Sequence, residues 1–267
     1  MHQLGKKNVI GILIDAVDYD ASVEFVLRSA RERRGAAVSA LAVHGVMTGV
    51  LDPAHKYRLN HFDLLVPDGQ PVRWVLNWLH SAKLEDRVYG PNLTLKVCER
   101  AAAERLPIYL YGSTVETLAA LEKSLRERFP GIQIAGSEAS KFRRLTSSEK
   151  SEIAERIVQS EAAITFVGLG CPRQECFAFE FRDALSMPVL AVGAAFPFIA
   201  GQVAQAPVWM QDRGLEWLFR LCAEPTRLWR RYLYLNPAYL FLIALQASGL
   251  SRFATDGILP VEEVLAG

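Results

Sequence analysis

A glycine-containing bend followed by polar residues is the stretch of this chain best suited to bind a charged ligand. The segment FVGLGCPRQE spans 166–175 and follows the apolar run AAITF, which predicts a buried strand, a bend and a helix. Gly168 and Gly170 let the backbone come close to a ligand, and Pro172 suits the first turn of the helix. Unpaired N–H groups and the positive end of the helix dipole favour an anion there, although an ordinary strand-to-helix turn is the alternative. The polar residues of that first turn are Arg173, Gln174 and Glu175.

Asp68 is the carboxylate whose position suggests general-base chemistry. It follows the short apolar strand expected within 63–70 and precedes Gly69, which places it at the carboxyl edge of a sheet. A partly buried carboxylate with a raised pKa could take a proton from an incoming hydroxyl group there. The alternative is a turn aspartate that caps the next helix, a role to which Pro-Asp-Gly is well suited. His44 follows another expected strand and could donate to a sugar or a phosphate, or could be an ordinary half-buried histidine.

The sequence implies neither a metal site nor a disulfide framework. Its four cysteines form no CxxC pair, and it has no Asp-x-Asp, the metal–nucleotide signature of many sugar-nucleotide enzymes. Cys171 lies in the central bend, where small loop filler is favoured over a reactive thiol. A formal net charge of +1 argues against a nucleic-acid partner.

Strands and helices alternate along most of the chain. We expect a first strand at 8–15 with Asp15 at its end, a helix from about 21 capped by Asp20, and a second strand at 37–43. This alternation predicts an α/β fold with a Rossmann-like, mostly parallel sheet and helices on both faces. Ligands bind at the carboxyl edge of such sheets, so a nucleotide is the natural guess. The strand ends expected along that edge include Gly112 with Ser113, Gly136, Gly168 and Gly193.

The character of the chain changes after about residue 202. We expect an α/β catalytic domain at 1–202, an α-helical C-terminal appendage at 203–250 and a loosely ordered tail at 251–267. Four arginines recur in the appendage at spacings that share one face of a continuous helix, although Pro225 should kink or split it. Such a face suits anionic lipid or pyrophosphate, and a solvated charged face is the alternative. These arginines are Arg213, Arg220, Arg227 and Arg231.

The apolar run 232–250 is nearly long enough to span a bilayer, but polar residues and a proline interrupt it. Peripheral attachment to a membrane or an oligomer interface is therefore favoured over a transmembrane helix. The first fifteen residues contain no apolar signal segment, so a cytoplasmic protein is expected.

Several segments together resemble the WecG/TagA/CpsF family of bacterial glycosyltransferases (glycosyltransferase family 26) over roughly residues 8–240. The resemblance implies inverting transfer of a sugar from a UDP-sugar to a polyprenyl-diphosphate-linked saccharide, without metal or other cofactor, in cell-surface polysaccharide biosynthesis. It also implies peripheral association with the inner face of the plasma membrane. The similar segments are VPDGQPV at 66–72, RVYGPNL at 87–93, YLYGS at 109–113, FVGLGCPRQE at 166–175, VGAAFPFIAGQVAQAP at 192–207 and GLEWLFRLCAEPTRLWRRYL at 214–233.

The same resemblance implies roles for particular residues. Asp68 matches the proposed catalytic base, the glycine bend belongs to the nucleotide-sugar site, and the appendage closes over the active site and meets the lipid diphosphate. Departures from the family pattern, among them Asn92 in place of the usual aspartate, leave the donor sugar open. The remaining residues expected at the substrate site are His44, Gly69, Asn92, Gly112, Ser113, Gly193, Arg220, Arg227, Arg230 and Arg231.

Two other functions compete with this one. A dinucleotide-dependent oxidoreductase would share the sheet, but the sequence after the first expected strand contains no G-x-G-x-x-G. A non-catalytic nucleotide-sugar-binding or scaffold protein of a polysaccharide assembly complex would share the binding site without the reaction.

Overall fold

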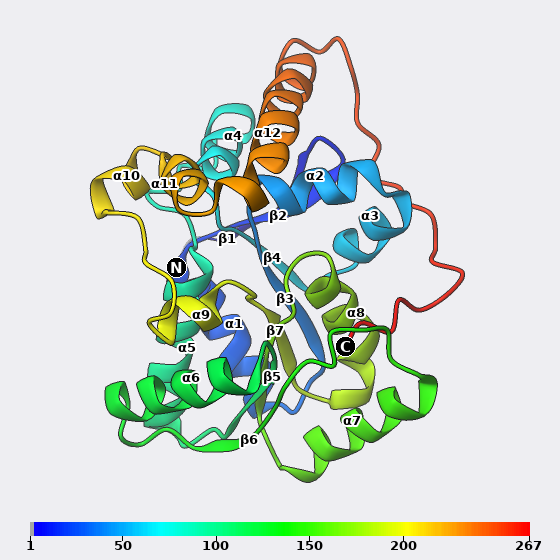
Figure 1. The fold of residues 1–267 in the computed structure, drawn as a ribbon. Helices are drawn as coiled ribbons and strands as arrows, with labels where there is room; N and C mark the ends of the chain where they lie inside the picture. The colour runs from blue at the N-terminus through cyan, green and yellow to red at the C-terminus, as the bar shows by residue number, and fades with distance from the viewer. Residues whose placement is uncertain (1–2) are drawn as a thin grey trace.

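The computed structural model describes residues 3–267 and has a six-stranded sheet between two layers of helices (Figure 1). Every neighbouring pair of strands is parallel, so the strands all end at one edge of the sheet. The expected α/β fold is therefore confirmed. In spatial order the strands are β4 (Leu64–Pro67), β3 (Ala36–Leu41), β8 (Pro188–Ala191), β7 (Ile164–Gly168), β5 (Ile108–Gly112) and β6 (Ile134–Glu138).

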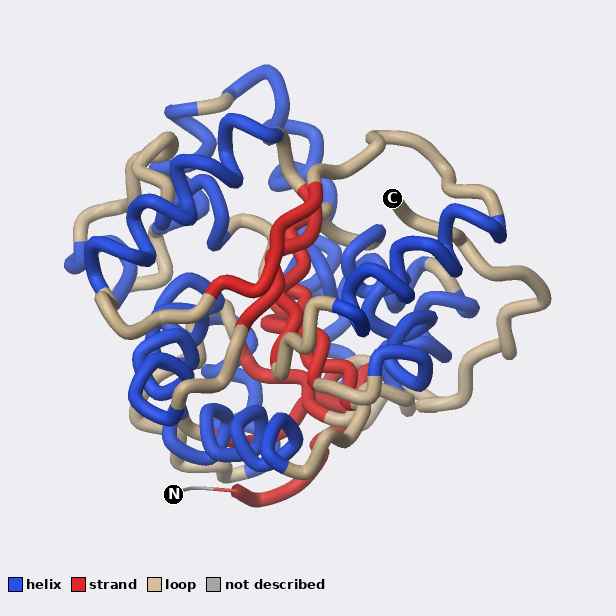
Figure 2. The backbone as a smooth tube through the Cα atoms, turned by 90° about the horizontal axis from the view of Figure 1, so that it is seen from below, coloured by secondary structure: helices blue, strands red, loops and turns tan. Residues whose placement is uncertain are grey.

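Helices cover both faces of this sheet, as the view along it shows (Figure 2). Strand β5 explains why both faces must be covered, because its side chains alternate between two apolar clusters. Ile108 and Leu110 belong to one cluster, and Tyr109 and Tyr111 belong to the other. One face is covered by α1 (Tyr19–Arg31), α5 (Gly90–Glu104), α6 (Val115–Arg128) and α9 (Ala195–Ile199), and the other by α2 (Val43–Leu51), α3 (Pro53–Asn60), α7 (Ser147–Gln159) and α8 (Arg173–Leu185).

The prediction of a single first strand at 8–15 is wrong. The chain instead forms an antiparallel hairpin, β1 (Gln3–Val9) and β2 (Ile12–Val17), which is a separate two-stranded sheet. The turn falls at Ile10 and Gly11, whose φ angles are 45° and 91°. A two-residue hairpin turn of this kind needs positive φ at both central positions, and an isoleucine there gives no warning in the sequence.

Asp15 lies inside β2 rather than at a strand end. Its Oδ2 accepts a hydrogen bond from Leu65 N at 2.8 Å and pairs with Lys6 Nζ at 3.0 Å, so it attaches the hairpin to β4. Helix α1 is capped by Asp18, whose side chain accepts a backbone N–H of the first turn, and not by Asp20 as expected. Both Asp15 and Asp18 therefore stabilise local structure.

The glycines expected at strand ends divide into two groups. Gly112 and Gly168 do end neighbouring strands and pair with each other, and Gly193 lies two residues beyond β8. Gly136 does not end a strand, because it pairs with Tyr109 within β6. A Cβ at that position would lie 2.6 Å from Cε2 of the Tyr109 ring, so the glycine provides room for the ring.

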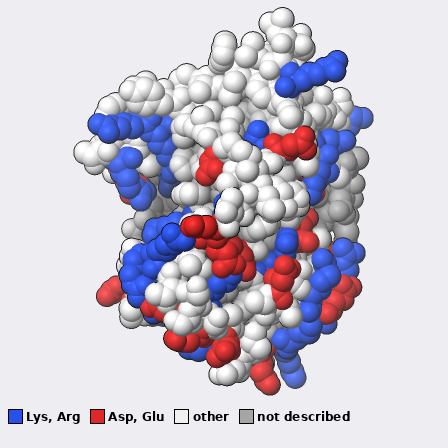
Figure 3. Space-filling view, turned by 90° about the vertical axis from the view of Figure 1, so that its right-hand side faces the viewer, with Lys and Arg blue, Asp and Glu red and all other residues white. Residues whose placement is uncertain are grey.

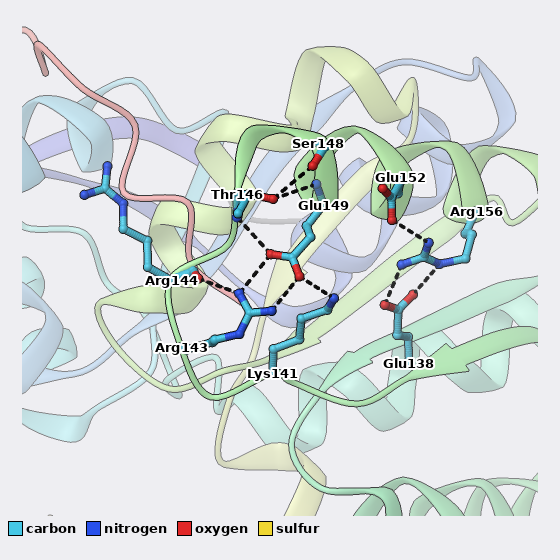
Figure 4. A network of polar contacts seen from close by, with 9 residues as sticks. All are labelled: Glu138, Lys141, Arg143, Arg144, Thr146, Ser148, Glu149, Glu152 and Arg156. Atoms are coloured by element: carbon cyan, nitrogen blue, oxygen red, sulfur yellow. Dashed lines mark hydrogen bonds and ion pairs between the residues drawn. The ribbon is translucent and has the colours of Figure 1, made fainter.

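A network of charged residues stabilises the start of α7 (Figure 4). Thr146 and Glu149 form a capping box, in which each side chain accepts the backbone N–H of the other residue. The Glu149 carboxylate also pairs with Lys141 at 2.8 Å and with Arg143. These contacts hold the loop between β6 and α7, and their residues do not line the cavity described below.

Three C-terminal helices and α4 (Gln70–His80) form the upper end of the molecule in Figure 1. Pro225 splits the expected continuous helix, because α11 (Glu216–Ala223) ends just before it and α12 (Pro225–Ala247) starts with it. The arginines spaced by seven therefore belong to different elements: Arg213 follows α10 (Val208–Asp212), Arg220 lies on α11, and Arg227 lies on α12. The expectation that Pro225 kinks or splits the helix is confirmed, and the arginines therefore do not share one helical face.

The final segment, 251–267, contains no helix but is hydrogen-bonded to the rest of the chain. Asn8 Nδ2 donates to Phe253 O at 2.8 Å, and Leu145 N donates to Leu265 O at 2.8 Å. Within the described part of the chain, no helix combines the length and the hydropathy needed to cross a bilayer.

Candidate active site

A cavity of about 680 Å³ lies between the carboxyl edge of the sheet and the C-terminal helices. Asp68 and Gly69, which follow β4, and His44, at the start of α2, contribute the sheet side of its lining. Arg220 and Arg231 contribute from α11 and α12. An apolar wall completes it, formed by Trp74, Val75, Trp78, Leu235, Tyr239, Leu240 and Ile243. The cavity thus combines an acid, cations and apolar surface that come from distant parts of the sequence.

The surroundings of Asp68 favour the neutral form of its carboxyl group. Burial raises the pKa of Asp68 to about 6, and the Glu216 carboxylate acts in the same direction. The Arg87 guanidinium and a hydrogen bond from Gly90 N to Oδ1, 2.8 Å long, oppose this shift. A carboxylate whose pKa lies close to neutral pH is well matched to accept a proton from a hydroxyl group.

Arg87 connects Asp68 to the appendage. Its Nη2 donates to Glu216 Oε2 on α11 at 2.7 Å, and the two side chains are only 8% and 14% exposed. Its guanidinium also lies over the Tyr89 ring, 4.3 Å from the ring centroid. The pairing of Arg87 with Glu216 was not expected from the sequence, although the motifs RVYGPNL and GLEW contain the two residues. Their pairing depends on the packing of α11 against the loop after α4, which the motifs do not encode.

Arg220 and Arg231 line the cavity without a carboxylate partner in the described chain, as does Arg213, whose guanidinium lies over the Trp209 ring at 5.9 Å. Neither Arg220 nor Arg231 forms an ion pair within residues 3–267, and the buried Nε atom of each lacks a hydrogen-bond partner there. Burial lowers the pKa of Arg231, and the nearby Arg220 charge adds to this effect. Two guanidinium groups without counter-ions are chemically suited to bind an anion such as a diphosphate.

His44 is neutral in this environment. Burial lowers its pKa to about 3, and the charge of Arg231 acts in the same direction. Its Nδ1 atom is buried and has no hydrogen-bond partner in the described chain. A neutral imidazole with one unpaired nitrogen can donate to or accept from a sugar hydroxyl group.

The glycine bend lies at the same edge of the sheet. Gly168 ends β7 beside Gly112, and its carbonyl oxygen accepts a hydrogen bond from Ser113 N at 3.0 Å. A Cβ on Gly168 would lie 2.5 Å from the Phe196 ring, so no larger residue fits without movement. Pro172 precedes α8 as its N-cap residue, and the expectation that it belongs to the first turn is off by one position.

The buried side chains of Gln174 and Glu175 stabilise the glycine bend through hydrogen bonds. Gln174 Oε1 accepts from Gly170 N at 3.1 Å, and its Nε2 donates to Glu175 Oε1 at 2.8 Å. Ser39 Oγ on β3 donates to the same Glu175 oxygen at 3.1 Å. A Cβ on Gly193 would meet Gln174 Oε1 at 2.3 Å, so Gly193 makes room for this side chain. Both side chains lie in the interior and do not line the cavity.

Asp68 and the glycine bend therefore lie at the same edge of the sheet, but only Asp68 lines the cavity. Strands β3 and β8 separate β4 from β7, which puts the two strand ends about 14 Å apart at roughly 4.8 Å per strand. Arg231 acts on both sides of this gap: its charge adds to the lowering of the His44 pKa by burial, and it opposes the rise in the Cys171 pKa that burial causes.

Four further predicted site residues lie outside the cavity. Arg173 is exposed on α8 and donates to Leu169 O at 3.2 Å. Asn92 is exposed in the first turn of α5. Arg227 pairs with Glu224, and Arg230 lies over the Trp229 ring at 5.2 Å; both are exposed on α12.

The fold and this site define a class of protein: an α/β protein with a charged cavity at the carboxyl edge of a parallel sheet, beneath a helical appendage, the place where ligands bind in such folds. Residues 7–252 match the family described as "Glycosyl transferase WecG/TagA/CpsF family", and the chain belongs to this family. The chain is also 30% identical, over 190 residues and 71% of each chain, to the N-acetylglucosaminyldiphosphoundecaprenol N-acetyl-beta-D-mannosaminyltransferase of Bacillus spizizenii. The resemblance seen in the motifs is confirmed, and the oxidoreductase alternative is disfavoured.

Proposed function

We propose that the protein is an inverting, metal-independent glycosyltransferase that moves a sugar from a UDP-sugar to a polyprenyl-diphosphate-linked saccharide in cell-surface polysaccharide biosynthesis. One observation carries this proposal: the raised-pKa carboxyl group of Asp68 lines the same cavity as the unpaired Arg220 and Arg231. The name of the Bacillus relative gives an acceptor of this class, a diphosphoundecaprenol carrying N-acetylglucosamine.

The reaction is a single displacement at the anomeric carbon of the donor. Asp68 takes the proton of the acceptor hydroxyl group as its oxygen forms the new bond to that carbon. The bond between the carbon and the UDP oxygen breaks on the opposite side, and UDP leaves with the electron pair. One displacement inverts the anomeric configuration, and the proton ends on Asp68.

The negative charge that grows on the departing diphosphate needs cationic partners. Arg220 and Arg231 supply two guanidinium groups in a partly desolvated cavity, where each interaction is stronger than in water. The bend at 168–172 and the first turn of α8, with Arg173, lie at the same edge and add backbone N–H groups. In this proposal the arginines and the helix terminus do the work that a divalent metal ion does in other sugar-nucleotide enzymes.

The apolar wall of the cavity suits the lipid part of the acceptor. Trp74 and Trp78 on α4 are 43% and 66% exposed, and α12 exposes Leu233, Tyr234, Leu240 and Phe241. The end of the molecule formed by α12 is mostly uncharged in the space-filling view apart from a few basic side chains, whereas most acidic side chains lie lower down (Figure 3). In this proposal that end rests against the inner face of the plasma membrane, and the diphosphate reaches the arginines beneath it.

The direct test is a panel of UDP-sugars incubated with a short-chain prenyl-diphosphate saccharide and no added metal. We expect mass spectrometry to detect one product with the added sugar, and NMR to show the inverted anomeric configuration. A thermal-shift panel should show stabilisation by UDP and none by NAD(P), through mass action. A retained anomeric configuration would refute the single displacement, and UDP binding with no product from any donor would favour the scaffold alternative.

A further inference from the structure

Three side chains with metal-binding atoms meet beside the glycine bend, outside the lining of the cavity. His55 comes from α3, Cys171 from the bend and Glu175 from α8. A ring nitrogen, the thiol sulfur and a carboxylate oxygen all lie within 4.8 Å of one another. His55 and Glu175 are each only 1% exposed, whereas Cys171 is partly exposed and gives access from solvent.

Two of these side chains have unsatisfied polar atoms. Within residues 3–267, the buried atoms His55 Nε2 and Glu175 Oε2 have no hydrogen-bond partner. The other carboxylate oxygen, Oε1, already accepts from Ser39 and Gln174. A buried polar atom without a partner destabilises the fold, so two of them in one cluster with a thiol indicate a missing ligand.

We propose that His55, Cys171 and Glu175 bind one zinc ion. Zinc takes imidazole nitrogen, thiolate sulfur and carboxylate oxygen together, usually with four ligands, so a water molecule would complete the shell. On binding, the thiol of Cys171 loses its proton to solvent and no electron is transferred. The thiolate and the carboxylate then neutralise the two positive charges of the ion, which keeps the buried site neutral.

The geometry needs only a small adjustment. Ligand atoms around a tetrahedral zinc ion lie about 3.3–3.8 Å apart when the bonds are about 2.0–2.3 Å long, so the cluster has to contract by about 1 Å. Gly170, next to Cys171, has a φ of +78° and open space at the position of a Cβ, so no neighbouring atom crowds that side of the bend. The other ring nitrogen of His55, Nδ1, lies 4.0 Å from Sγ of Cys176, which is also on α8.

Such an ion would have a structural effect. It would attach the bend to α3 and α8, and thereby fix the backbone between Gly168 and Pro172. Asp68 and the arginines of the cavity are not among its ligands, so the transfer reaction does not pass through this ion.

Cobalt substitution tests the site without any activity measurement. The full chain is treated with a chelator and titrated with Co²⁺, and we expect about one equivalent to produce a sulfur-to-cobalt charge-transfer band together with the visible bands of a four-coordinate ion. Zn²⁺ should displace the cobalt and raise the melting temperature. Cys171→Ser should abolish the band, and Glu175→Gln should weaken binding at least tenfold.

Two other cysteines provide matched controls. Cys98 is buried elsewhere and Cys222 is exposed, so Cys98→Ser and Cys222→Ser should retain the band. Absence of the band in the wild-type protein, or its persistence in Cys171→Ser, would overturn the proposal. Should Cys171→Ser not fold, X-ray absorption of the zinc-loaded wild-type protein decides: one sulfur ligand supports the site, and none or more than one rejects it.

Discussion

Replacement of Asp68 by asparagine should impair the transfer reaction without disrupting the fold. The amide oxygen of the introduced asparagine can still accept the hydrogen bond from Gly90 N, which is 2.8 Å long in the wild-type protein. The amide cannot take a proton from the acceptor hydroxyl group. General-base catalysis contributes about 10²–10⁴-fold, or about 3–5 kcal/mol, so we expect kcat to fall by at least about 10² with little change in UDP affinity.

The same substitution should stabilise the protein. The pKa of Asp68 is raised from 3.8 to about 6, so the folded state holds this proton more tightly than the unfolded state. The resulting stabilisation is present at low pH and is lost as pH rises towards and through 6. The difference between the two pKa values corresponds to at most about 3 kcal/mol. Because asparagine does not ionise, Asp68→Asn should gain up to this amount above pH ~7 and nothing below pH ~4.

Mass-spectrometric initial rates and urea unfolding at pH 5 and pH 8 measure the two effects. The wild-type kcat should rise with pH and level off above about 6, because only the ionised carboxylate accepts the proton. Asp52→Asn is the matched control, since Asp52 caps α3 on the surface and asparagine caps equally well. A kcat of Asp68→Asn above about one tenth of wild type, or a flat pH profile between 5 and 7, would refute Asp68 as the base.

Three further changes test other parts of the site. Arg231→Gln should weaken UDP binding about 10- to 100-fold in calorimetry, which is the loss expected for hydrogen bonds to a charged group. The control Arg230→Gln, at an exposed side chain, should change UDP binding little. Equal effects of the two substitutions would argue against a specific site. Gly168→Ala should lower the free energy of unfolding by about 1–3 kcal/mol in urea, because its Cβ would lie 2.5 Å from the Phe196 ring, and an unchanged midpoint would contradict the packing described. Trp78→Ala, at a side chain 66% exposed, should reduce transfer to a long-chain acceptor in vesicles more than to a short-chain soluble one, and equal rates would remove this residue from lipid binding.

Much of the sheet could be predicted from the sequence because most of its strands are short apolar runs, and β4, β5 and β7 end at proline or glycine. The hairpin at the N-terminus could not, since its turn contains Ile10 and the apolar residues run through the turn without a break. The position of Gly136 within β6 could not be predicted either. The sequence does not distinguish a glycine that makes room for an aromatic ring inside a strand from a glycine that ends a strand.

The site was only partly predictable for a related reason. Asp68 and the glycine bend carry local signals, whereas the importance of Arg87 depends on Glu216, which is 129 residues away along the chain. Gln174 and Glu175 are polar residues next to a bend, and the sequence does not show that their side chains point inward to Gly170 and Ser39. Packing between distant segments decides both cases.

The Arg87–Glu216 pair has a consequence for where an anion binds. Any anion that enters the cavity meets a guanidinium group that already holds a carboxylate at 2.7 Å. To bind Arg87, the incoming anion must displace that carboxylate from a largely buried ion pair. An anion can therefore bind Arg220 and Arg231 without breaking an ion pair, whereas binding to Arg87 requires one to be broken.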